Sequence, residues 1–143
     1  NWDSPDAVHR ERLCSDILSL ASGRSVVTPY NSDTFSISNG NPTAGGKTIL
    51  PRELLIVEGL FMLLPGFSPM VPVLSVFVEC RVDVALRRRL RPIMTPDYIS
   101  RVHIPMFYKH VASQKHCADL ILDGENVSVE QNATLILTRL NLQ

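Results

Sequence analysis

The chain has 143 residues, enough for one domain with a single core, and 45% of them are hydrophobic, as is typical of a folded protein. Its 14 Lys and Arg residues balance 14 Asp and Glu residues, so no net charge favours nucleic acid or an acidic membrane as a partner. Three scattered cysteines argue against a disulfide framework or a zinc cluster and favour a reducing, cytoplasmic setting. We therefore expect one globular domain spanning residues 1–143.

The first predicted elements are a helix and a pair of strands. Ser4 can cap a helix, Pro5 suits its first position, and apolar residues recur at helical spacing until Gly23. The stretches SVVTPY (25–30) and KTILP (47–51) predict two short strands. The segment between them is rich in Ser, Asn, Thr and Gly, which predicts a loop and hence a β-hairpin insertion.

Three continuous apolar runs predict strands buried on both faces of a parallel sheet, namely LLIVEG (54–59), VLSVFVE (73–79) and ADLILDG (118–124). Predicted helices alternate with them: a basic one at 82–91, one from Pro96 to about Val111 with a kink near Pro105, and an amphipathic one at the C-terminus. This alternation predicts an α/β fold with a mostly parallel sheet. Three strands are few for such a sheet, which indicates that part of it is missing or supplied elsewhere.

Three stretches occur in a recognisable order: NWDSPDA at residues 1–7, LLIVEG at 54–59, and VFVE at 76–79 followed by DVALRRRLR and KHCADLIL. This order resembles that of the uridine kinase / phosphoribulokinase family of P-loop kinases. The resemblance implies an incomplete P-loop NTPase-like parallel sheet flanked by helices. It also implies transfer of the γ-phosphoryl group of ATP, with Mg²⁺, to a nucleoside or a similar small alcohol.

The family's N-terminal strand, phosphate loop and following helix have no counterpart in this sequence. Gly46, Lys47 and Thr48 match the end of the phosphate-loop motif, but Asn41 stands where its first glycine belongs. Pro51 follows where a helix would begin, so a hairpin turn explains this segment better. We therefore expect the chain to be inactive as a kinase on its own.

The resemblance implies that three residues bind the substrate. Trp2 would stack on a nucleobase, and Asp3 would accept hydrogen bonds from ribose hydroxyls, which suit a carboxylate with two oxygens. Tyr30 would reach over the nucleoside from the hairpin. The alternative is local: Trp2 packs on the first helix and Asp3 helps to cap it.

Charged residues further along the chain are candidates for contacts to metal and phosphate. Glu58 ends a predicted strand, where ligands bind in open α/β sheets, and would hold Mg²⁺ directly or through water. Its alternative role is to cap the next helix. Arg88 and Arg91 would contact transferring phosphates, because guanidinium groups match phosphoryl oxygens. Their alternative is a solvated helix face.

Histidines and a pair of aromatic residues have simpler expected roles. The histidines show no metal-ligand spacing and are expected at the surface or at helix ends: His9, His103, His110 and His116. Phe107 and Tyr108 are expected in the core.

The sequence departs from the family pattern in two places. After Tyr30 it lacks the aromatic residue and the histidine of the family's hairpin, which puts uridine or cytidine specificity in doubt. Its lid is short, because Arg91 is followed at once by Pro92, and a short lid excludes water poorly. The alternative function is therefore a catalytically inactive kinase-like protein that binds partners. Homo-oligomerisation is left open.

Overall fold

The computed structural model describes residues 3–28, 46–67, 73–89 and 95–142. The chain divides into two compact units. The first comprises Asn1–Val8, Gly59–Ser68 and Pro72–Gln143, and the second comprises His9–Glu58 and Pro69–Val71. Two compact units can belong to one domain, so a single domain over residues 1–143 stays a prediction.

The predicted first helix is present in two pieces. A 3-10 turn, η1 (Pro5–Ala7), comes first, and the Ser4 side chain accepts a hydrogen bond from the backbone N–H of Asp6. The helix α1 (Arg10–Ala21) follows. The prediction of one continuous helix is wrong because the backbone at Val8 is extended, with φ −105° and ψ 128°.

The second unit also contains the two predicted short strands. β1 (Val26–Val27) and β2 (Thr48–Ile49) pair antiparallel, and the Arg12 guanidinium ties α1 to β1 by donating to the Val27 carbonyl at 2.8 Å. Residues 29–45 lie outside the described residues. The strands are therefore confirmed, whereas the hairpin insertion between them stays a prediction.

The predicted strand at residues 54–59 is wrong. This segment has no strand conformation, and residues Leu54 and Ile56 are 50% and 80% exposed. A strand needs a neighbour, because its backbone N–H and C=O groups bond across the sheet. Among the described residues, no strand pairs with this run, so its apolar side chains have no sheet in which to be buried.

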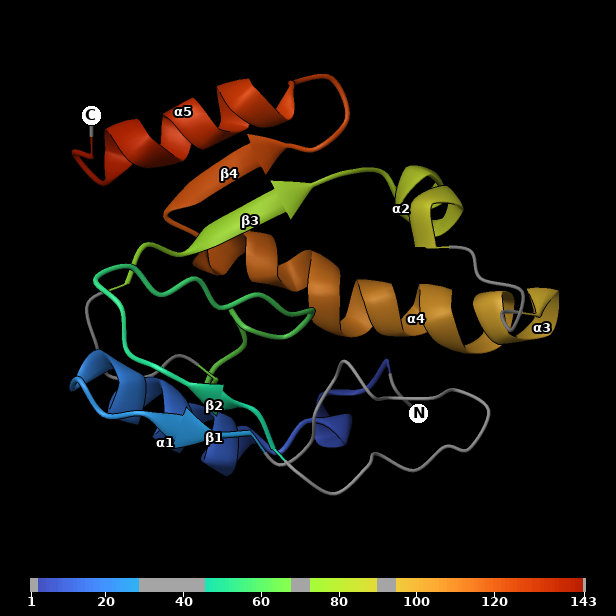
Figure 1. Cartoon of the computed structure of the whole chain (residues 1–143). Helices are drawn as coiled ribbons and strands as arrows, with labels where there is room; N and C mark the ends of the chain where they lie inside the picture. The colour runs from blue at the N-terminus through green and yellow to red at the C-terminus, as the bar shows by residue number, and fades with distance from the viewer. Residues whose placement is uncertain (1–2, 29–45, 68–72, 90–94, 143) are drawn as a thin grey trace. The chain divides into compact units, whose positions relative to one another are not determined.

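The first unit is built on a parallel pair of strands, β3 (Val76–Glu79) and β4 (Leu120–Asp123). Leu122 of β4 is 3% exposed and belongs to the core. Figure 1 shows α5 (Val129–Arg139) alongside β4 and α2 (Val82–Arg89) following β3. The α/β class with parallel strands is thus confirmed, while an incomplete P-loop NTPase-like sheet stays a prediction.

A long helical run joins α2 to β4 in sequence. It comprises α3 (Pro96–Tyr98), η3 (Ile99–His103), α4 (Ile104–Met106), η4 (Phe107–Val111) and η5 (Ala112–Cys117). The Thr95 side chain caps its first turn by accepting from the Tyr98 N–H at 3.2 Å. The wider π turns η3 and η4 lie on either side of the Pro105 turn. Pro105 has no N–H for an α-helical hydrogen bond, so departure from α geometry is expected there.

Candidate functional site

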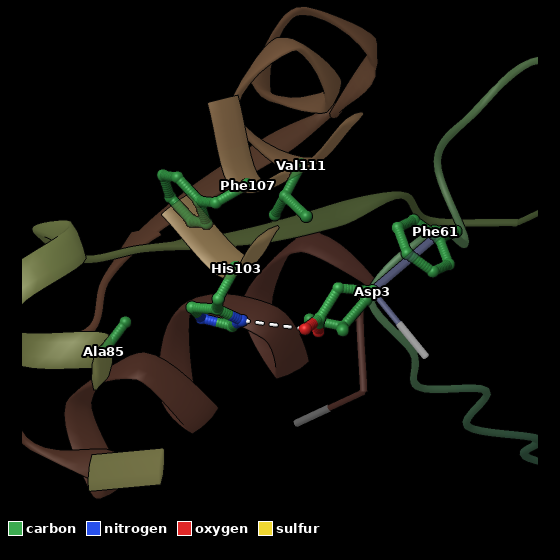
Figure 2. A pocket seen from close by; sticks show the side chains of 7 residues that line it. Asp3, Phe61, Ala85, His103, Phe107 and Val111 are labelled. Atoms are coloured by element: carbon green, nitrogen blue, oxygen red, sulfur yellow. Dashed lines mark ion pairs between the residues drawn. The ribbon is translucent and has the colours of Figure 1, made fainter. Parts of the chain in front are cut away.

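A small cavity in the first unit is enclosed by segments far apart in the sequence. Its lining residues are Asp3, Leu60, Phe61, Ala85, His103, Phe107 and Val111 (Figure 2). Its volume is about 90 Å³. Pockets that enclose a whole small molecule measure about 300–1,000 Å³. In this state the cavity therefore has room for one edge of a small ligand or for a few waters.

Asp3 is the buried acidic group of this cavity. It is 4% exposed, and its Oδ2 atom lies 3.1 Å from Nδ1 of His103 and accepts a hydrogen bond from the Tyr98 hydroxyl at 2.7 Å. A buried carboxylate is costly unless it is paired and hydrogen-bonded, and these two groups provide such contacts. Ser4 caps the neighbouring turn, so a capping role for Asp3 does not explain its burial.

His103 lies at the end of η3, one of the two positions expected for it, but it does not lie at the surface. It is 6% exposed, and Figure 2 shows its imidazole turned toward Asp3. The sequence held one signal for this. His103, Phe107 and Val111 recur every four residues, which places them on one helical face, and all three line the cavity. The expectation of exposure holds for His9 and His116.

Gln114, which the sequence did not single out, fixes one wall of the cavity. It is 3% exposed, and its Nε2 donates to the carbonyls of Leu60 and His110, at 2.7 Å each. Its Oε1 accepts from the Leu63 N–H at 2.9 Å. The amide therefore holds residues 60–63 against the helical run and so positions Phe61, which is 4% exposed.

The described arginines of α2 contact protein groups. Arg88 is exposed and donates to the Gly124 carbonyl at 2.7 Å, just after β4, while Arg87 pairs with Asp83 at 3.0 Å. Helix α2 nevertheless reaches the cavity through Ala85. The structure thus brings Asp3 and α2 to one cavity, and a role for Arg88 toward phosphate stays a prediction.

The carboxyl ends of β3 and β4 carry two acidic residues. Glu79 contacts the Lys115 ammonium at 2.5 Å. Asp123 accepts hydrogen bonds from the backbone and side chain of Asn126 and from the backbone of Glu125, which together hold its pKa below the usual value. These contacts close the turn after β4.

Of the remaining predicted site residues, the structure describes only Glu58. Glu58 belongs to the second unit and is exposed. Trp2, Tyr30 and Arg91 lie outside the described residues, so their roles stay predictions. In the part of the chain that the structure describes, no three His, Cys, Asp or Glu residues are grouped as a metal site would require.

Of Phe107 and Tyr108, expected in the core, Phe107 is half-buried while Tyr108 is 60% exposed. Within the same described ranges, no helix has the length and apolar character needed to cross a membrane.

The parallel strands and flanking helices define an α/β protein, and comparison with known proteins narrows this class. No protein-family model matches the sequence. The chain is 27% identical over 131 residues to a uridine kinase of Vibrio atlanticus and 28% identical over 133 residues to one of Shewanella pealeana. A uridine kinase of Vibrio vulnificus is 27% identical over 132 residues.

Each of these matches covers 85% of this chain and 60% of the relative. The resemblance to uridine kinases is therefore confirmed, and the chain spans about 60% of the length of the curated relatives it matches.

Proposed function

We propose that the protein is a fragment or a divergent member of the uridine kinase group, which transfers a phosphoryl group from ATP to a hydroxyl of a nucleoside or a similar small alcohol. Two observations support this proposal. The chain is similar to proteins named uridine kinase over 85% of its length, and the resemblance implies a substrate role for Asp3. The observation that carries it is the burial of the Asp3 carboxylate in a mostly apolar cavity.

In this proposal Asp3 binds the sugar. An ionised carboxylate accepts several hydrogen bonds, and Asp3 receives one from the Tyr98 hydroxyl beside the His103 imidazole. Vicinal hydroxyls of a ribose match such an acceptor, and the cavity of about 90 Å³ fits the sugar edge rather than a whole nucleoside. Trp2 and Tyr30 would contact the base.

ATP and Mg²⁺ are the cofactors that the proposal implies, but the described residues do not fit them. Thr48 of the Gly46-Lys47-Thr48 run lies in β2, where a phosphate loop would lead into a helix. Glu58 is a single exposed carboxylate without a second acidic neighbour in the grouping that a metal site would need among the described residues. No step of the reaction is therefore assigned to ATP or Mg²⁺. Arg88, Arg91 and Glu58 stay candidates for contacts with these cofactors.

The position of residues 46–48 at the start of a strand favours one alternative function. Because residues 46–48 lead into a strand, the described part of the chain offers no phosphate cradle. A catalytically inactive kinase-like protein that binds a nucleoside or a protein partner would need none. Measurement of uridine phosphorylation with ATP separates the two functions when it is made on the product of the complete gene.

Calorimetric titration of uridine into the full chain tests the substrate site. The Asp3→Asn variant keeps the shape of the side chain but removes its charge, and we expect about tenfold or greater loss of affinity, as for a hydrogen bond to a charged group. Asp6→Asn changes an exposed acid nearby and should leave binding unchanged. Circular dichroism checks that both variants fold.

Failure of the unsubstituted chain to bind uridine would refute the nucleoside site. If Asp3→Asn binds uridine as tightly as the unsubstituted chain, the nucleoside binds elsewhere than in this cavity. Separately, we expect no ATP-dependent phosphorylation of uridine by the chain alone, and turnover in a coupled assay would overturn that expectation.

A further inference from the structure

We propose that His103 is a positioning residue for the nucleoside site: its imidazole holds the Asp3 carboxylate in the orientation that receives the sugar hydroxyls. This inference rests on the proposed function and adds a residue to it. His103 was expected at the surface or at a helix end, and neither the resemblance nor the comparisons assign it a role.

The geometry supports this role through shared burial. Asp3 is 4% and His103 6% exposed, and Nδ1 of the imidazole lies 3.1 Å from Oδ2 of the carboxylate. The other walls of the cavity are apolar, including Phe61, Phe107 and Val111. In such surroundings a carboxylate orients toward whichever hydrogen-bond donor is fixed nearby, because turning away would leave a buried charge poorly compensated.

Two groups contact the same carboxylate oxygen. The Tyr98 hydroxyl donates a hydrogen bond to Oδ2 of Asp3 at 2.7 Å, and Nδ1 of His103 lies 3.1 Å from that oxygen. Both groups come from one helical run, with Tyr98 in α3 and His103 at the end of η3. Fixing one oxygen from that side determines the plane of the carboxylate, and so determines where its second oxygen, Oδ1, lies. A substrate hydroxyl then meets an acceptor that is already oriented, which lowers the entropic cost of binding.

The test is calorimetric titration of uridine into the full chain and four variants. We expect His103→Leu, which removes the donor, to weaken binding about tenfold. His103→Asn places an amide nitrogen where Nδ1 stood, and we expect it to bind within about threefold of the unsubstituted chain. Tyr98→Phe removes the second donor and should weaken binding about fivefold. His116→Leu, at an exposed histidine of the same helical run, should bind normally.

The variants also separate positioning from simple destabilisation. If His103 acts through Asp3, then Asp3→Asn combined with His103→Leu should lose no more affinity than Asp3→Asn alone, because the second change removes an interaction already lost. If His103→Leu does not fold, His103→Asn and Tyr98→Phe still carry the comparison. Equal loss in His103→Leu and His103→Asn would overturn the inference, since shape rather than the donor would then matter.

Two failures can be told apart. Unchanged uridine binding by both His103→Leu and Tyr98→Phe overturns the positioning role and leaves the proposed function standing. Absence of uridine binding by the unsubstituted chain refutes the nucleoside site itself, and the inference falls with it.

Discussion

Replacement of Gln114 by leucine tests whether one buried amide maintains the wall of the cavity. Leucine has similar bulk but cannot form any of the three hydrogen bonds that the amide makes with Leu60, Leu63 and His110. The backbone of residues 60–63 would then lose its attachment to the helical run. We expect a less stable protein in which Phe61 is held more loosely.

The size of the effect follows from these contacts. Each hydrogen bond contributes about 0.5–1.5 kcal/mol net, so the three together contribute about 1.5–4.5 kcal/mol. Burying a leucine side chain at the same site returns about 1.5–3 kcal/mol at most, and less where the fit is imperfect. Because these three hydrogen bonds are only partly buried, water can reach part of the released backbone and limit the penalty. We therefore expect a net loss of about 1–2 kcal/mol.

Urea unfolding followed by circular dichroism measures this loss. A lower midpoint at an unchanged slope is expected, together with faster hydrogen exchange at the Leu63 amide, which loses its acceptor. Gln131→Leu is the control, because Gln131 is exposed and its side chain accepts a single hydrogen bond, from the Ser128 N–H at 3.1 Å. An unchanged midpoint with an equally protected Leu63 amide would refute this account of Gln114.

Two further predictions concern the turn after β4. In Gly124→Ala the new Cβ would lie 2.9 Å from Cγ1 of Val78 and 3.0 Å from the Glu79 carbonyl oxygen, so we expect a loss of about 1–3 kcal/mol in urea unfolding. Gly59→Ala, which would meet only a flexible side chain, should lose less, and equal losses would contradict the steric argument. The lowered pKa of Asp123 stabilises the fold above the carboxyl's unfolded-state pKa, and this stabilisation disappears as the pH falls through the lowered value. Asp123→Asn should therefore lose less stability than the unsubstituted chain between pH 7 and about pH 3, and equal losses would contradict it.

Signals within a few residues of one another predicted much of the local structure. Ser4 was predicted to cap a helix, and its side chain accepts a hydrogen bond from the backbone N–H of Asp6, two residues further on. The continuous apolar runs at β3 and β4 were found in the same way. The order of motifs was enough for the resemblance to uridine kinases, which the comparisons confirm.

The sequence by itself therefore determined most of the local elements and the family resemblance, because capping, periodicity and motif order depend on residues close along the chain. Only the tertiary structure decided which apolar and charged side chains are buried. The run at 54–59 has the composition of a strand but no pairing partner among the described residues. Asp3 meets Tyr98 across 95 positions of sequence, and His103 joins them in the same cavity. Such burial depends on contacts between distant segments, for which a single sequence holds no local signal.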